Sequence, residues 1–299
     1  MSALIDISTF PVNLVLDQLL KDRTTGKNII FATDAYEEQS PKFGEKCQIT
    51  ADMLASGELK IYPRVEKEFE AQQLRQRTKA EVFTPSWIVN KMNNNCDAEW
   101  FGEMGLFNRE TEIGWLVNPT PIHFRKGLSW KKYVNSRRLE ITCGEAPYLV
   151  SRYDTVSGQI IPVAERIGIL DRKLRVVTEK VKNEKEWKEW SLRAFQSVYA
   201  YEFQGDSLLI ARINLLLTFV EYLQEYFGQV PTEKEIFDVA NVIVWNVWQM
   251  DGLTNLVPFG VLPVSQQFDL FYDNSILQNC NSGYCKTFDW QENKEFFIN

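Results

Sequence analysis

The chain has 299 residues, of which 44% are hydrophobic and 24% charged, so it can form a globular protein with a sizeable core. A net charge of −7 excludes a chain that coats nucleic acid non-specifically, although a local basic face could still bind DNA. With no apolar run near the roughly 20 residues of a membrane span, no secretory signal and an odd number of cysteines, we expect a cytoplasmic protein without a membrane partner.

Hydrophobic spacing and turn residues predict several elements in the first third of the chain. The expected elements are a helix that starts near Pro11, a strand at 28–32, a helix at 49–54, an exposed helix or linker over 64–79, and a helix from Ser86 or Trp87 to about Met92. Residues 93–135 contain asparagine runs and tryptophans without clear periodicity, which predicts an irregular insertion.

The rest of the chain alternates strand-like and helical patterns. We expect a second insertion near 152–197, which includes a long connection over 159–175. The elements expected there and beyond are a charged helix at 183–197, a strand at 198–202, a long amphipathic helix at 207–227 and a helix from Pro231 to about 244. This alternation favours a doubly wound α/β sheet.

The most informative stretch is 139–149, where an apolar segment ends at Glu140 and a turn of small residues follows. Such a turn brings backbone N–H groups close to an anionic ligand at the carboxyl end of a strand. Gly144 is its only glycine, so the phosphate-loop and dinucleotide fingerprints both fail. The stretch resembles the S-adenosylmethionine (SAM) loop of adenine-specific DNA methyltransferases, with Ile141 in place of the usual proline and Ala146 in place of the second glycine.

Three further segments resemble the same family in the expected order. Residues 78–89 resemble the segment that precedes the cofactor loop in one subclass, residues 198–216 resemble the second strand and its helix, and residues 244–253 resemble the third strand with its acidic end. The resemblance extends from about 43 to 290 and is closest to the methylase subunits of restriction–modification systems. It implies a Rossmann-like SAM-dependent methyltransferase sheet at 77–299, preceded by a mainly helical extension at 1–76.

The resemblance implies SAM-binding roles for residues of the first two segments. Phe83, Thr84 and Pro85 would lie against the cofactor, with Thr84 offering polar groups to its carboxylate; without the resemblance, this Thr-Pro would be only a helix cap. In the loop, Glu140 would orient the cofactor's ammonium group, and Thr142, Cys143 and Gly144 would form the turn that makes room for it. Cys143 as a nucleophile is the alternative, but nothing ties His123, the only histidine, to this loop.

The resemblance also assigns roles to two later acidic residues. Glu202, at the tip of the second strand, would accept both ribose hydroxyls, a geometry also used for nicotinamide ribose. Asp251 would hydrogen-bond the adenine amino group. The structural alternatives are a solvated strand end for Glu202 and an ordinary Asp-Gly turn for Asp251.

The motif that receives the flipped target base in this family, Asn/Asp-Pro-Pro-Tyr/Phe, is missing after residue 253. Ordinary loop prolines explain the similar string at 118–121 better. We therefore expect no catalytic residue and no metal, and interpret the chain as the SAM-binding part of a truncated or split DNA adenine-N6 methyltransferase. Its expected partners are double-stranded DNA and a partner chain or missing C-terminal part. The alternatives are a catalytically inactive interaction or regulatory subunit, and a methyltransferase acting on a small molecule or protein.

Two other features have competing interpretations. The basic segment from Arg125 to Arg138 is interpreted either as a phosphate-contacting strip or as a solvated face beside a core strand. Cys280 and Cys285 are treated as structural, because two cysteines without further ligands are weak grounds for a metal site.

Overall fold

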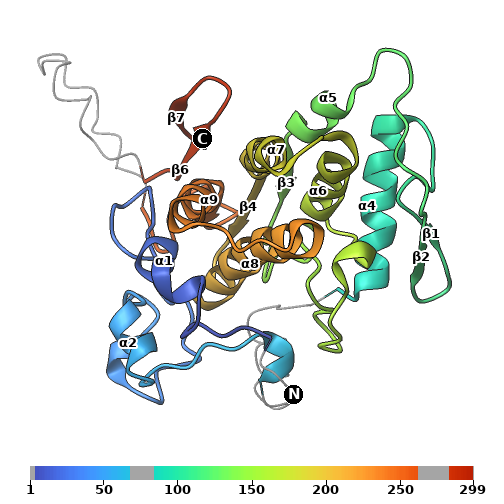
Figure 1. The fold of residues 1–299 in the computed structure, drawn as a ribbon. Coiled ribbons are helices and arrows are strands. Elements are labelled where there is room, and N and C mark those ends of the chain that lie inside the picture. Colours follow the sequence, from blue (N-terminus) through green and yellow to red (C-terminus); the bar gives the residue numbers. More distant parts are fainter. Residues whose placement is uncertain (1–3, 68–83, 262–282, 299) are drawn as a thin grey trace, which may run out of the picture.

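The computed structural model describes residues 4–67, 84–261 and 283–298. Its centre is a three-stranded parallel sheet with the order β3-β4-β5, where β3 is Arg138–Glu140, β4 is Val198–Glu202 and β5 is Val247–Gln249. Helices pack around this sheet, and Figure 1 shows β3 and β4 near the centre of the molecule, among the helices α6 to α9. The chain is therefore a mixed α/β protein.

The central strand β4 fixes the register of both its neighbours. Leu139 lies opposite Tyr199 on one side, and Gln249 lies opposite Glu202 on the other. The sequence Val-Tyr-Ala-Tyr suits this position, because β-branched and aromatic residues favour strands and both faces of a parallel sheet are usually covered. Because all three strands run the same way, Glu140, Glu202 and Gln249 end at the same edge of the sheet.

Pairs of helices connect the strands. Between β3 and β4 lie α6 (Ile169–Lys180) and α7 (Glu184–Gln196), and between β4 and β5 lie α8 (Gly205–Phe227) and α9 (Glu233–Asn246). Thr232 and Glu235 form a capping box that starts α9, and Asn183 caps α7. The expected helices at 183–197, 207–227 and 231–244 and the expected strand at 198–202 are thus confirmed, with shifts of two residues or fewer at their ends.

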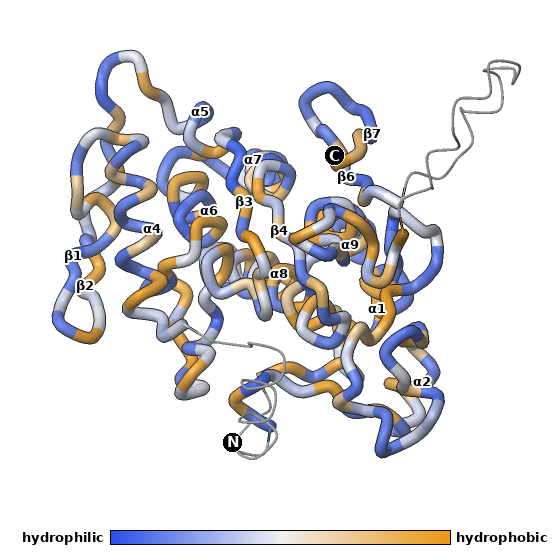
Figure 2. Tube along the Cα trace, turned by 180° about the vertical axis from the view of Figure 1, so that it is seen from behind, coloured by the Kyte–Doolittle hydropathy of each residue, from blue (hydrophilic) through white to orange (hydrophobic). Residues whose placement is uncertain are grey.

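The N-terminal residues pack onto the same core as the sheet helices. Helix α1 (Val12–Leu19) lies against α8 and α9, and its buried apolar residues belong to the same hydrophobic cluster as theirs. Figure 2 shows hydrophobic residues in α1, α8 and α9, and hydrophilic ones around the β6–β7 turn. The short helix α2 (Ala51–Ala55) is capped by Thr50 and confirms the helix expected at 49–54. The predicted domain boundary at 76 lies outside the described residues.

The strand predicted at 28–32 is wrong, because this segment makes only isolated bridges to Lys21 and Gln48. Its apolar residues pack beside the end of β5, and the segment does not join the sheet as a strand. Ile30 N–H donates to the side chain of Gln249 at 3.0 Å, and its carbonyl accepts from the same amide at 2.8 Å. The segment therefore sits against the end of β5.

The insertion predicted as irregular at 93–135 is largely ordered. Helix α4 runs over Ser86–Phe101 instead of ending near Met92, and it is followed by a hairpin of β1 (Asn108–Glu110) and β2 (Trp115–Val117), then by α5 (Trp130–Asn135). The prediction failed because α4 buries three asparagines, Asn90, Asn93 and Asn94, together with Val89 and Phe101, and so has no clear apolar stripe. The Asn108 side chain hydrogen-bonds those of Asn90 and Asn94, with distances from 2.8 to 3.1 Å.

The long connection predicted over 159–175 is also wrong, because α6 begins within it at Ile169. Three charged residues interrupt its apolar pattern: Asp171, Arg172 and Lys173 are all buried in α6. Asp171 accepts from Ser151 N–H, Arg172 donates to the side chains of Asp97, Asn90 and Asn94 in α4, and Lys173 donates to Val134 O of α5. The sequence pattern does not identify these partners. Near the C-terminus, β6 (Lys286–Asp289) and β7 (Lys294–Phe297) form a hairpin. Three short 3-10 helices cover Pro41–Phe43, Arg64–Glu66 and Val163–Glu165.

Gly205, the first residue of α8, touches the backbone of residues 30 and 31. Its N–H donates to Phe31 O at 2.9 Å, and a Cβ added there would lie 2.0 Å from Ile30 O. Gly205→Ala is therefore expected to lower the free energy of unfolding by about 1–3 kcal/mol through overpacking. Urea unfolding measures this, with Gly44→Ala as the matched control, since a Cβ at Gly44 meets nothing closer than 3.4 Å. Equal stabilities of the two variants would contradict the close approach.

Candidate functional site

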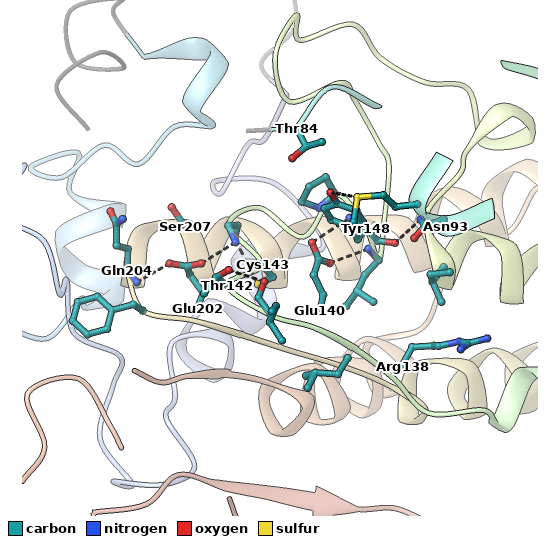
Figure 3. A pocket seen from close by; sticks show the side chains of 18 of the residues that line it. Thr84, Asn93, Arg138, Glu140, Thr142, Cys143, Tyr148, Glu202, Gln204 and Ser207 are labelled. Atoms are coloured by element: carbon teal, nitrogen blue, oxygen red, sulfur yellow. Dashed lines mark hydrogen bonds between the residues drawn. The ribbon is translucent and has the colours of Figure 1, made fainter. Parts of the chain in front are cut away.

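A cavity of about 910 Å³ opens where β3 and β4 end, and this volume is within the usual range for small-molecule sites. The predicted site residues that line it are Thr84, Glu140, Thr142, Cys143, Gly144 and Glu202. Figure 3 shows the two carboxylates of Glu140 and Glu202 along one wall with Thr142 and Cys143 between them. The structure thus brings the residues of the loop and the tip of β4 to one cavity.

Glu202 is buried at the tip of β4, and its two oxygens are oriented by backbone. Gly144 N–H donates to Oε2 at 2.8 Å and Gln204 N–H donates to Oε1 at 3.0 Å. Burial raises the pKa of this carboxyl above its usual value, although these hydrogen bonds act in the opposite direction. Because a carboxylate oxygen accepts more than one hydrogen bond, each oxygen can still accept from a ligand hydroxyl.

The turn after β3 is built from residues in the left-handed region. Thr142, Gly144 and Ala146 have φ angles of 46°, 54° and 63°. Ala146, which stands where the resemblance expects a second glycine, therefore keeps a backbone conformation that glycine favours, at a cost of about 1–2 kcal/mol. Cys143 N–H donates to Tyr201 O at 2.9 Å and ties this turn to β4.

Glu140 is buried at the end of β3 and holds the chain that follows the turn. Its Oε1 accepts from Tyr148 N–H at 3.2 Å and its Oε2 accepts from Leu149 N–H at 2.9 Å. Burial raises the pKa of Glu140 to about 8, against these hydrogen bonds and with a smaller contribution from the charge of Glu202. The carboxyl thus lines the cavity and also supports its wall.

The raised pKa of Glu140 predicts a pH dependence of stability. Its carboxyl titrates near 4.5 when exposed and near 8 in the folded chain, so its contribution to stability is complete below pH 4.5 and is lost as the pH rises to 8. The stability of the wild type relative to Glu140→Gln, which cannot titrate, should fall by about 1.4 kcal/mol per pH unit in that window. Urea unfolding at pH 5, 6.5 and 8 tests this. If the free energies of unfolding of the two proteins change with pH in the same way, the pKa of Glu140 is not raised.

The environment of Cys143 disfavours the nucleophile interpretation. Its thiol is buried, and its pKa is raised well above the usual value by burial and by the charges of Glu140 and Glu202. Nucleophilic cysteines instead have a lowered pKa, because the thiolate is the reactive form. His123 is exposed and is not among the residues that line the cavity.

The helix start at Thr84 and Pro85 is only partly placed as the resemblance implies. Thr84 lines the cavity, whereas Pro85 precedes α4 without lining it. The first amide of the helix is already bonded, because Ser86 N–H donates to Asp154 Oδ2 at 2.7 Å. Phe83 lies outside the described residues.

Asp251 is not among the residues that line the cavity. Its Oδ1 accepts from Leu253 N–H at 2.9 Å, and its own N–H donates to Leu256 O at 2.8 Å. In this conformation Asp251 organises a turn, as the structural alternative expects.

Several lining residues are not among those predicted from the sequence. They include Asn93 and Met92 of α4, Arg138 of β3, Gln204 and Ser207 at the start of α8, and Phe259. Asn93 Nδ2 donates to Tyr148 O and to Ile167 O, both at 3.0 Å, and so joins α4 to the wall of the cavity. Gln204 and Ser207 could have been proposed, because they directly follow the strand that ends at Glu202.

The basic segment makes contacts within the chain. Arg125 pairs with Glu103, Arg137 pairs with Asp289, and Lys131 lies over the rings of Trp130 and Trp190; these contacts favour the solvated-face interpretation. The loop at 118–121 is bonded to Arg175, whose Nη2 donates to Asn118 O at 2.6 Å. Cys285 is buried, Cys280 lies outside the described residues, and the described part of the chain contains no cluster of side chains suited to a metal ion.

Comparisons with models of protein families, with curated proteins and with solved structures found no match for this chain. Within the three described stretches, no helix is long and apolar enough to cross a membrane. The function therefore has to be argued from the cavity and from the residues that form it.

Proposed function

We propose that the cavity binds SAM and that the chain is the SAM-binding part of a DNA adenine-N6 methyltransferase of a restriction–modification system, with a Rossmann-like sheet. The observation that carries this proposal is the convergence of Glu202 and the left-handed turn at Gly144 on one cavity at the carboxyl edge of a parallel sheet. In open α/β sheets, ligands bind in the crevice at this edge.

The polar groups of the cavity fit a nucleoside with a positively charged substituent. Glu202 presents two carboxylate oxygens, each oriented by one backbone N–H, which suits the two adjacent hydroxyls of a ribose. Two carboxylates line the cavity, those of Glu45 and Glu202, against one guanidinium, that of Arg138. The third carboxyl of the cavity, that of Glu140, has a pKa of about 8 and is mostly protonated at neutral pH. This excess of negative charge favours a sulfonium and an ammonium group, and it disfavours the pyrophosphate of a dinucleotide.

In the proposed reaction, bound SAM supplies a methyl group to the amino nitrogen of adenine. The chain's own residues bind and orient the cofactor, so their contribution to rate is positioning. The sequence contains no Asn/Asp-Pro-Pro-Tyr/Phe motif. The pocket for the flipped base and the DNA contacts would accordingly come from a further polypeptide segment, in this chain or in another.

A ligand panel tests the proposal through thermal unfolding. SAM and S-adenosylhomocysteine are expected to raise the melting temperature, because a ligand at 100 times its Kd stabilises the folded state by about 2.7 kcal/mol. NAD and ATP at the same concentration should have no effect. A shift with NAD or ATP and none with SAM would contradict the proposal and indicate another nucleotide.

A second candidate function is a catalytically inactive subunit with this fold. Two observations favour it: Asp251 is not among the lining residues, and the first amide of α4 already donates to Asp154. Such a subunit would unfold cooperatively, and no ligand of the panel would change its melting temperature.

A further inference from the structure

The end of the cavity beyond Glu202 lies next to the base of any nucleoside whose ribose Glu202 binds. Figure 3 shows Gln204 at this end, with Glu202 between it and Glu140. The resemblance assigns Glu140 to the ammonium group of SAM, so the base belongs on the opposite side of Glu202. The lining residues joined at this end are Ala32, Glu45, Phe203 and Phe259.

Phe203 and Phe259 form the aromatic part of this end. Their rings meet edge to face, with centroids 5.8 Å apart and planes at 72°. Phe259 occupies the third position of a turn that Gly260 N–H closes by donating to Val257 O at 2.8 Å, and its φ is 60°. Glycine or asparagine usually takes such a position, because a positive φ is unfavourable for bulky residues. A strained aromatic residue that lines a cavity and is 43% exposed points to contact with a ligand.

Glu45 of the N-terminal part lies beside this aromatic pair. Ala32 N–H donates to Glu45 O at 2.7 Å, and the carbonyl that precedes Ala32 accepts from Gly205 N–H at 2.9 Å, so the segment packs against the start of α8. The ammonium of Lys46, the next residue, lies 5.2 Å from the centre of the Phe259 ring. These contacts place Glu45 at the aromatic end of the cavity that it lines.

We propose that the N-terminal part of the chain completes the base subsite, with Glu45 accepting a hydrogen bond from the amino group of adenine and Phe259 packing against its ring. The inference rests on the proposed function and names a residue that selects the base. It gives Glu45 the role that the resemblance implies for Asp251. The carboxylate of Asp251 instead accepts from Leu253 N–H in a turn, and Asp251 does not line the cavity.

The chemistry of Glu45 predicts a preference among purines. Its backbone N–H donates to Glu37, whereas its carboxylate makes no hydrogen bond or ion pair with the described residues and is available to a ligand. An ionised carboxylate accepts hydrogen bonds and donates none. It therefore pairs with the amino group at position 6 of adenine, but it repels the oxo group at the same position of hypoxanthine. A site that hydrogen-bonds a ligand group discriminates strongly against the analogue that lacks the group.

Displacement of labelled SAM from the full chain by two competitors tests this assignment. The competitors are S-adenosylhomocysteine and S-inosylhomocysteine, which differ only in the amino or oxo group of the base. The wild type should bind the amino form at least about tenfold more tightly than the oxo form. In Glu45→Gln this ratio should fall below about threefold, because the amide can donate to the oxo group as well as accept from the amino group. Glu38→Gln, a control at an exposed residue of the same segment that does not line the cavity, should keep the wild-type ratio.

Two further variants separate contact with the ring from selection of the amino group. Phe259→Leu should weaken both competitors by the same factor, at least about threefold, and so leave their ratio unchanged. Asp251→Asn should change neither affinity. An unchanged ratio in Glu45→Gln, a reduced ratio in Asp251→Asn instead, or a wild type that does not distinguish the competitors would overturn the assignment while SAM binding, and with it the proposed function, would stand. Failure of the wild type to bind SAM and both competitors would overturn the two together.

Discussion

Asp97→Ala is expected to lower the free energy of unfolding by about 3–5 kcal/mol, the usual cost of removing one partner from a buried ion pair. Asp97 Oδ2 accepts from Arg172 Nη1 at 2.6 Å, and its Oδ1 accepts from Tyr133 Oη at 3.0 Å. Arg172 is 1% exposed and also donates to Asn90 and Asn94. Without Asp97 its charge stays buried, because the two amide oxygens do not neutralise it.

The matched control for Asp97 is an ion pair on the surface. Glu103 and Arg125 pair at 2.8 Å with side chains 41% and 55% exposed. Glu103→Ala should change the free energy of unfolding by at most about 1 kcal/mol, because solvent screens such pairs. Both variants are measured by urea unfolding with a shared m-value. A cost below about 1 kcal/mol for Asp97→Ala would contradict the buried network, and with it the packing of α4 on α6.

Glu202→Gln is expected to have the largest effect on ligand affinity. The amide keeps the size of the side chain but removes the charge and one acceptor oxygen, so one ribose hydroxyl loses a hydrogen bond to a charged group. Such a bond contributes about 1.5–3 kcal/mol, which corresponds to a roughly tenfold to hundredfold rise in Kd for SAM.

Equilibrium dialysis with labelled SAM measures this rise in Kd. Glu58→Gln serves as the matched control, because Glu58 is exposed and does not line the cavity. The control variant should bind SAM as the wild type does. Equal affinities of Glu202→Gln and the wild type would show that Glu202 does not bind the ribose of SAM.

The elements that the sequence predicts well are those that bury an apolar stripe. Helix α8 carries leucines and isoleucines at helical spacing, and β4 is a short apolar run between two helices, so local pattern and tertiary packing agree. Helices α4 and α6 escape this reasoning because buried polar residues interrupt their apolar pattern. The buried hydrogen bonds from Arg172 to Asn90 and Asn94 join the two helices, and partners so distant along the chain cannot be identified from local spacing.

In the candidate site, too, some features follow from local sequence and others do not. Glu140 and Glu202 could be placed together in advance, because each ends a strand and the carboxyl ends of neighbouring parallel strands share one edge. The left-handed conformation of Ala146 could not be predicted, because glycine, not alanine, is the residue that indicates a positive φ angle. Asp251 shows the limit of reasoning from strand ends: it follows β5, yet its carboxylate caps the next turn and is not among the lining residues.

Binding of SAM to the isolated chain is the central claim, and calorimetric titration tests it most directly. Two temperatures are needed, because an enthalpy near zero at one of them would hide binding. The account predicts a single site per chain with a Kd in the micromolar range, and competition by S-adenosylhomocysteine. No heat at either temperature from a chain that unfolds cooperatively would contradict it and would leave the inactive subunit as the better description of this protein.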